Sequence, residues 1–142
     1  MSGDATLYEE SFQITTVVDD KYERVARVLG ASQDSLTSLT LDINNELYPL
    51  AVGDNISMCL ATTLNLDGTK DERGWRDRKG EPSLADLWDY VCYGKIYRFE
   101  QADNEKNIKC YVSFGGLLLC LDGPHRKLSP LRIDHVYMLL KK

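Results

Sequence analysis

The sequence feature that most limits the fold is a pair of glycines between two apolar runs, within the stretch YVSFGGLLLCLDG at residues 111–123. The run after the glycines, Leu117–Leu121, contains five apolar residues and ends at Asp122. A helix needs roughly ten or more residues and rarely begins at glycine, so this run predicts a β-strand covered on both faces, at the centre of the core. The glycine pair predicts a hairpin turn or a bend, with close approach of another backbone as the alternative.

Other segments also have the residue pattern of strands. Residues 38–44 show the clearest alternation, with Leu39, Leu41 and Ile43 on one side. The remaining strands are predicted at 7–18, 24–31, 56–63, 89–100, 108–114 and 136–140. Strands without intervening helices pair antiparallel by default, and closure into a barrel removes exposed edges. The sequence therefore predicts an all-β fold, a closed or nearly closed antiparallel barrel of about eight strands.

Two segments are predicted to fall outside this pattern. Residues 65–82 hold five basic and five acidic residues, with only Leu66 and Trp75 to bury. Such a segment cannot offset the entropy of ordering, so we expect a mobile loop, with stacking of Trp75 on a partner as the alternative. Ser83 is expected to cap a short helix whose apolar face is Leu84, Leu87 and Trp88. Residues 124–130 are expected to be irregular.

The length of 142 residues suits one domain, spanning residues 1–142. No stretch approaches the roughly 18 apolar residues of a membrane helix. The start of the chain lacks the pattern of a signal peptide, so we expect a reducing compartment, cytosol or nucleus. Cys59, Cys92, Cys110 and Cys120 form no C-x-x-C pair, which favours packed reduced thiols over zinc or a disulfide framework.

Charge is distributed unevenly along the chain. Residues 1–50 hold three basic and nine acidic residues, a net charge of −6. Residues 121–142 hold five basic and two acidic residues, a net charge of +3. The acidic first third disfavours nucleic-acid binding by the whole surface, whereas a local basic patch near the C-terminus stays open.

Candidate catalytic residues are few. His125 and His135 have no partner nucleophile or ligand set near them in the sequence, so surface or capping roles are expected. Asp86 and Asp89 would share a helix face, which is typical of a solvated acidic face. No nucleophile elbow, metal cluster or nucleotide motif occurs. The sequence therefore predicts a protein that is not an enzyme, with no catalytic residue, metal or cofactor.

Six aromatic residues are the remaining feature of the sequence that could indicate a function. On a barrel they could belong to the core, or they could form a stacking platform for single-stranded nucleic acid. The core interpretation is favoured, because only Lys95 and Arg98 supply positive charge within the aromatic strand. The six residues are Tyr90, Tyr93, Tyr97, Phe99, Tyr111 and Phe114.

Three segments together resemble a known family. They are SLTLDINNELYP at 38–49, SLADLWDYVCYGKIYRFE at 83–100 and the stretch at 111–123, followed by the terminal VYMLLKK. In this order they are similar to the eighth subunit shared by eukaryotic nuclear RNA polymerases I, II and III, from Phe12 to Lys142. The resemblance implies an OB-like barrel of eight strands, a non-catalytic structural and assembly role in DNA-templated transcription, and a nuclear location that includes the nucleolus. Family members often carry a basic residue where this chain has Cys120.

The resemblance also implies partners. They are the largest subunit, against which the barrel would dock, and other subunits of RNA polymerases I, II and III, with nucleic acid touched at most weakly and indirectly. No membrane and no small-molecule ligand are expected. Missing side chains permit close approach of a backbone, so we predict that the partner-binding residues are Tyr93, Gly94, Phe114, Gly115 and Gly116. The alternatives are a free-standing protein that binds single-stranded nucleic acid and a barrel that holds an apolar ligand in its lumen.

Overall fold

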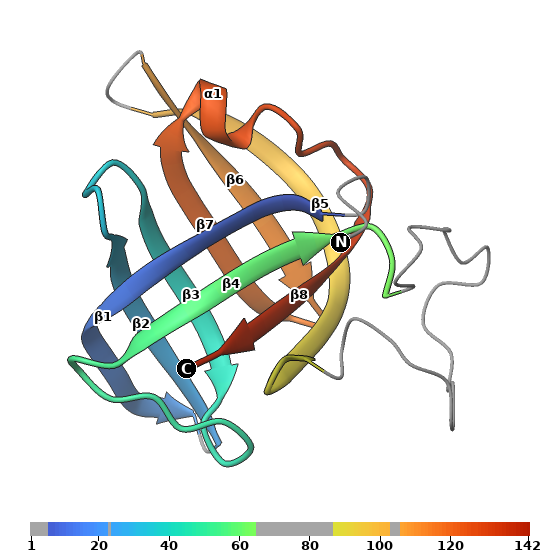
Figure 1. The fold of residues 1–142 in the computed structure, drawn as a ribbon. Coiled ribbons are helices and arrows are strands. Elements are labelled where there is room, and N and C mark those ends of the chain that lie inside the picture. The colour runs from blue at the N-terminus through green and yellow to red at the C-terminus, as the bar shows by residue number, and fades with distance from the viewer. Residues whose placement is uncertain (1–5, 23, 65–86, 103–105) are drawn as a thin grey trace.

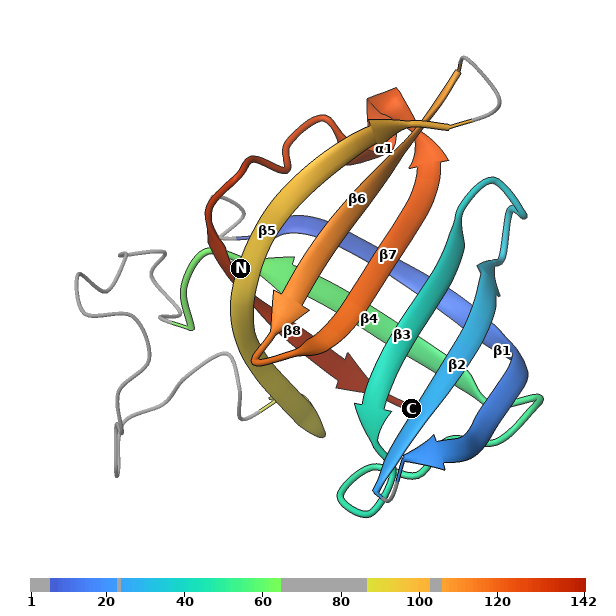
Figure 2. The same cartoon turned by 180° about the vertical axis from the view of Figure 1, so that it is seen from behind.

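The computed structural model describes residues 6–22, 24–64, 87–102 and 106–142. Its strands form one closed antiparallel barrel in the order β1-β2-β3-β7-β6-β5-β8-β4 (Figures 1 and 2). The strands are β1 (Thr6–Tyr22), β2 (Val25–Ser32), β3 (Ser38–Asn44), β4 (Asn55–Ala61), β5 (Tyr90–Gln101), β6 (Asn107–Phe114), β7 (Leu117–Pro124) and β8 (His135–Lys141). The predicted all-β antiparallel barrel of about eight strands is confirmed.

Strand β1 closes the barrel by pairing with β2 on one side and β4 on the other. It is 17 residues long, and its register against β2 shifts between Ile14 and Thr16. Such irregularities bend a strand, and Figure 1 shows β1 curving around the barrel. Strand β3 spans the residues that alternation predicted. Strand β4 ends at Ala61 instead of continuing to Thr63.

The glycine pair forms the two-residue turn between β6 and β7. Phe114 pairs with Leu117 across it, and Gly115 and Gly116 have φ angles of +63° and +100°. Hairpins with two-residue turns favour positive φ at both positions because that backbone matches the twist of the strands, and glycine adopts it without steric cost. The predicted hairpin is confirmed.

The prediction that Leu117–Leu121 is covered on both faces was wrong. Leu119 and Leu121 are fully buried inside the barrel, but Leu118 is 38% exposed on the outside. Successive side chains of a strand point to opposite faces, so an apolar run alone does not show what covers the outer face. Strands β4 and β8 are buried on both faces, because a second cluster lies outside them, formed by Cys59, Ala61, Leu64, Tyr137 and Leu139.

The interior of the barrel is filled by the protein's own side chains. The largest of them come from most of the strands and from α1, and each is less than 2% exposed. They are Phe12, Ile14, Leu39, Leu41, Ile43, Ile56, Met58, Leu60, Ile96, Leu119, Leu121 and Leu128. This packing counts against a ligand in the lumen.

One end of the barrel is closed by α1 (His125–Leu128), a single helical turn in the segment predicted to be irregular. Leu128 is 1% exposed and packs into the core. The Lys127 ammonium lies 3.2 Å from both carboxylate oxygens of Glu10 on β1, and it also pairs with Asp34 in the β2–β3 loop. The turn was not predicted because its anchors are distant in the sequence and leave no local pattern.

The opposite end of the barrel is closed by two tyrosines. The rings of Tyr48 and Tyr90 stack with centroids 5.2 Å apart. The Tyr90 hydroxyl accepts a hydrogen bond from the backbone N–H of Asn44 at 3.3 Å. Burial raises the pKa of Tyr90 to about 12, so the phenol stays protonated at neutral pH.

Two predicted features cannot be compared with the structure in full. The charged loop at 65–82 and the start of the predicted helix at Leu84 lie outside the described residues. At the described end of that segment, Leu87 is 64% exposed while Trp88 packs beside Val91 on the second cluster. The Lys141 ammonium lies 4.7 Å from the centroid of the Trp88 ring. Among the described residues, no helix is long and apolar enough to cross a membrane.

The ion pairs of α1 predict a pH dependence of stability. Lys127, the Ser32 hydroxyl and the Leu36 N–H all bond to Asp34, which holds the pKa of its carboxyl well below the usual range. Because the folded-state pKa is lower than the unfolded one, this stabilisation is complete above about pH 4 and is lost as the pH falls towards the lowered pKa. Melting temperatures measured from pH 7 to pH 2 should therefore fall less steeply for Asp34→Asn than for the wild type. Parallel curves would contradict the assignment.

Candidate protein-interaction surface

The outer surface of β5, β6 and β7 carries a group of rings and one leucine, here called the aromatic face: Tyr93, Tyr97, Tyr111 and Leu118. Tyr97 is 45% exposed, Tyr93 and Leu118 are each 38% exposed, and Tyr111 is half-buried. On β5 the outward tyrosines alternate with the buried Gly94 and Ile96. An exposed apolar group of this kind is typical of a protein-interaction site.

Strand register places these side chains next to one another. On β6, Tyr111 stands opposite Arg98 of β5 and Cys120 of β7. Ser113 of β6 stands opposite Lys95 on β5 and Leu118 on β7 in the same way. Residues that are opposite in an antiparallel pair lie on the same face, so the aromatic face is continuous across three strands.

Ring contacts hold the aromatic face in place. The Tyr93 ring stacks on His135 with centroids 5.4 Å apart and planes 7° from parallel, and its centroid lies 4.7 Å from that of Tyr137. The ring centroids of Tyr97 and Tyr111 lie 6.2 Å apart, and the Arg98 guanidinium lies 5.6 Å from the centroid of the Tyr111 ring. Side chains that are already ordered lose less entropy when a partner binds.

Charged side chains lie beside the aromatic face. Lys95 and Arg98 are exposed on β5, and Arg98 also pairs with Glu100. Cys120 lies beside Tyr111, and burial raises the pKa of its thiol, which keeps it neutral. The face therefore has rings and Leu118 at its centre, with the exposed Lys95 and the Arg98–Glu100 ion pair beside it.

The predicted partner-binding residues divide into two groups. Tyr93, Gly115 and Gly116 are exposed, and the two glycines form the turn at the end of the β6–β7 hairpin. Phe114 is only 7% exposed and Gly94 is buried. Contact of any of the five with a partner stays a prediction.

Gly94 has an internal role. A Cβ atom at this position would lie 2.2 Å from the backbone oxygen of Ser113 and 2.5 Å from Cδ1 of Phe114. Strands β5 and β6 could not keep their spacing with any side chain there. The missing side chain of Gly94 permits close approach of β6.

The six aromatic residues do not act as one set. Tyr90 and Phe114 belong to the core and Phe99 packs against it, as the core interpretation predicted. Tyr93, Tyr97 and the half-buried Tyr111 lie on the outer surface, which that interpretation missed. His135 was expected in a surface or capping role but not against Tyr93, and Leu118 was not predicted to be exposed. Alternation on β7 could have indicated Leu118, since its neighbour Leu119 faces the core.

A carboxylate joins the aromatic face to the rest of the barrel. Strands β3 and β7 pair through only four positions, from Ser38–Asp122 to Leu41–Leu119. Beyond them, Asp42 accepts a hydrogen bond from the Leu118 N–H at 3.1 Å and two from the Arg27 guanidinium at 2.7 and 3.1 Å. The Asp42 side chain therefore extends the junction between β3 and β7, here called the β3–β7 seam, beyond the four paired positions.

Removing this carboxylate should open the seam. We expect Asp42→Ala to lower the free energy of unfolding by about 2 kcal/mol, because the Leu118 N–H loses its acceptor and Arg27 loses its ion pair. Asp42→Asn keeps an acceptor oxygen, so it should cost about 1 kcal/mol. Urea denaturation of both variants measures the difference. Unchanged stability of Asp42→Ala would show that Asp42 does not hold the seam.

The remaining candidate groups form no reaction centre among the described residues. Cys59 and Cys110 are buried free thiols, and burial raises their pKa values to about 11 and about 12. His125 and His135 are exposed. No group of three or more His, Cys, Asp or Glu side chains within the described ranges could hold a metal ion. Asp86, predicted beside Asp89, lies outside those ranges.

Comparison with known proteins identifies the family. The family model described as RNA polymerase Rpb8 matches residues 9–142. The chain is 40% identical over 140 residues to "DNA-directed RNA polymerases I, II, and III subunit RPABC3" of Schizosaccharomyces pombe, covering 99% of each chain. It is 41% identical to the Saccharomyces cerevisiae protein of the same name (96% of this chain, 98% of the relative) and 38% identical to that of Dictyostelium discoideum (96% of each). The chain therefore belongs to the RNA polymerase Rpb8 family.

Proposed function

We propose that this protein is a non-catalytic structural subunit of DNA-directed RNA polymerases I, II and III. The observation that carries the proposal is its similarity, along almost the whole chain, to relatives named as subunits of these three enzymes. A packed barrel with a ring-lined outer face suits a role in assembly. Membership of these complexes implies a nuclear location, and membership of polymerase I extends this to the nucleolus.

We infer that the protein docks on the largest subunit through the aromatic face and the turn next to it. Tyr93, Gly115 and Gly116 would contact the partner directly. Gly94 and the buried Phe114 would act from inside, since the missing side chain of Gly94 lets the Ser113 backbone and the Phe114 ring lie close to β5. Tyrosine rings with ordered positions are favourable anchors of protein interfaces, which supports this choice of surface.

Purification of a tagged full-length chain from cells, followed by mass spectrometry, tests the proposed function. The wild type should recover the subunits of all three polymerases. Recovery of none of them would overturn the proposal.

The docking surface has a separate test. Leu118→Asp should lower recovery of the largest subunit about tenfold, because a carboxylate would be desolvated in the interface. Val52→Asp is the matched control, since Val52 is 65% exposed in the loop between β3 and β4 and should assemble normally. Normal assembly of Leu118→Asp would remove the aromatic face as the docking surface and would leave the role as a subunit intact.

A free-standing protein that binds single-stranded nucleic acid is the second candidate. It is favoured by the outward Tyr93 and Tyr97 with Lys95 and Arg98 on the same strand, since rings and cations together bind bases and phosphates. Titration of a labelled oligonucleotide at several salt concentrations separates the two. A structural subunit should bind weakly or not at all, whereas the second candidate should bind tightly with a steep salt dependence.

A further inference from the structure

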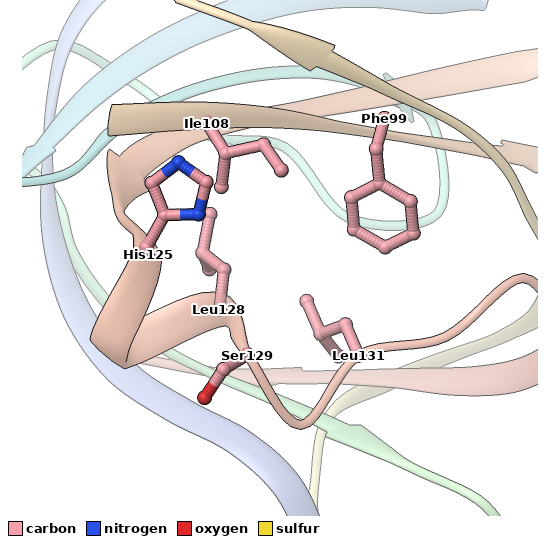
Figure 3. Close-up of a pocket in the computed structure, with 6 residues that line it drawn as sticks. All are labelled: Phe99, Ile108, His125, Leu128, Ser129 and Leu131. Atoms are coloured by element: carbon pink, nitrogen blue, oxygen red, sulfur yellow. The ribbon is translucent and has the colours of Figure 1, made fainter. Parts of the chain in front are cut away.

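A pocket of about 210 Å³ opens at the α1 end of the barrel (Figure 3). Four apolar side chains line it: Phe99 of β5, Ile108 of β6, and Leu128 and Leu131 around α1. Leu128 and Leu131 are at most 3% exposed, so the floor is part of the core. His125 and Ser129 complete the rim. The volume suits a single leucine or phenylalanine side chain rather than an extended ligand.

Two arginines lie beside this pocket. Arg126 follows His125 on α1 and is exposed, with no carboxylate partner among the described residues. The Arg132 guanidinium donates to the carbonyl oxygens of Ser129 and Leu131, which lie on the pocket wall. The rim therefore attracts an acidic partner.

The pocket is built on fixed elements. Lys127 anchors α1 to Glu10 and Asp34, and the Leu131 N–H donates to the Leu128 carbonyl at 3.0 Å. A wall that is already ordered lowers the entropy cost of binding. The pocket also lies away from the glycine turn: Ile108 and Gly115 are at opposite ends of β6, roughly 23 Å apart at the rise of a strand.

We propose that this pocket binds one apolar side chain, of leucine or phenylalanine size, from an acidic peptide segment of a partner protein. The apolar lining selects the anchor, and the cationic rim selects carboxylates on either side of it. A phosphate group has no apolar part to fill the floor, so a peptide fits better than a nucleic-acid backbone. This surface is separate from the aromatic face and does not depend on docking there.

Fluorescence anisotropy with the full-length chain tests the proposal. The probe is a labelled peptide of twelve residues, glutamates and serines with one central phenylalanine. We expect it to bind with a dissociation constant below 1 mM. Ile108→Trp, which fills the pocket, should weaken binding at least about tenfold, and Arg126→Glu about fivefold. Lys95→Glu, an exposed cation outside the pocket, is the matched control and should bind as the wild type does.

Further measurements decide between outcomes. Replacing the phenylalanine of the probe with alanine should weaken binding about tenfold, and equal binding would mean that charge alone acts, which overturns the proposal. Methyl NMR shifts should fall on Leu128 and Leu131, and shifts confined to the aromatic face would also overturn it. Displacement of the probe by an oligonucleotide would overturn the proposal as well, and so would the absence of binding at 1 mM peptide. Thermal melts check whether Ile108→Trp is folded. If Ile108→Trp is unstable, the loss of peptide binding in Arg126→Glu, at an exposed position, tests the proposal in its place.

Discussion

Replacing Gly94 with valine is expected to lower the free energy of unfolding by at least about 3 kcal/mol, the upper part of the range for overpacked interiors. The new Cβ would lie 2.2 Å from the Ser113 carbonyl oxygen, a backbone atom held by the β5–β6 pairing. Backbone cannot move aside as a flexible side chain can, so the two strands must separate. Thermal unfolding should show a fall in Tm of roughly 10 °C.

The matched control for Gly94→Val is Gly115→Asn. Gly115 has a φ of +63°, which asparagine tolerates, and a Cβ there meets no atom within 4 Å. We expect a loss below about 1 kcal/mol. If Gly94→Val were as stable as Gly115→Asn, the proposed packing of β5 against β6 would be wrong. Loss of polymerase assembly in Gly94→Val would follow from unfolding, so the turn glycines, not Gly94, test the interface.

Local patterns predicted the strands because each strand carries its own period-2 signal. The alternation at 38–44 gave β3 with its correct bounds, and the glycine pair gave the β6–β7 hairpin. Closure into a barrel followed from the need to remove exposed edges. The individual strands and the hairpin depend on residues that are close together in the sequence, whereas closure joins strands that are distant in it, such as β3 and β7.

Contacts between distant residues were not predictable from such patterns. Asp42 meets the Leu118 N–H across 76 positions of sequence, and Lys127 meets Glu10 across 117. The surroundings of Gly94, one of the predicted partner-binding residues, were also not predictable from the sequence. The sequence reveals a missing side chain inside a strand but does not reveal which backbone occupies the space. In the structure, that backbone is β6 of the same chain.

Adjacent leucines of β7 should separate stability from assembly. Leu119 is fully buried in the barrel, so Leu119→Ala is expected to lower the free energy of unfolding by about 3 kcal/mol through lost burial and the cavity left behind. Leu118 is 38% exposed, so Leu118→Ala should change it by less than about 1 kcal/mol. Chemical denaturation of both variants measures this difference.

In samples that contain equal amounts of folded protein, we expect Leu118→Ala to impair assembly more than Leu119→Ala does. Leu118→Ala removes part of the aromatic face and should lower recovery of the largest subunit severalfold, whereas the folded fraction of Leu119→Ala keeps that face intact. Because the two positions are neighbours on one strand with the same side chain, the comparison tests the side of the barrel to which each side chain points. Equal losses of stability would contradict the orientation of β7, and normal assembly of Leu118→Ala would contradict the aromatic face as the docking surface.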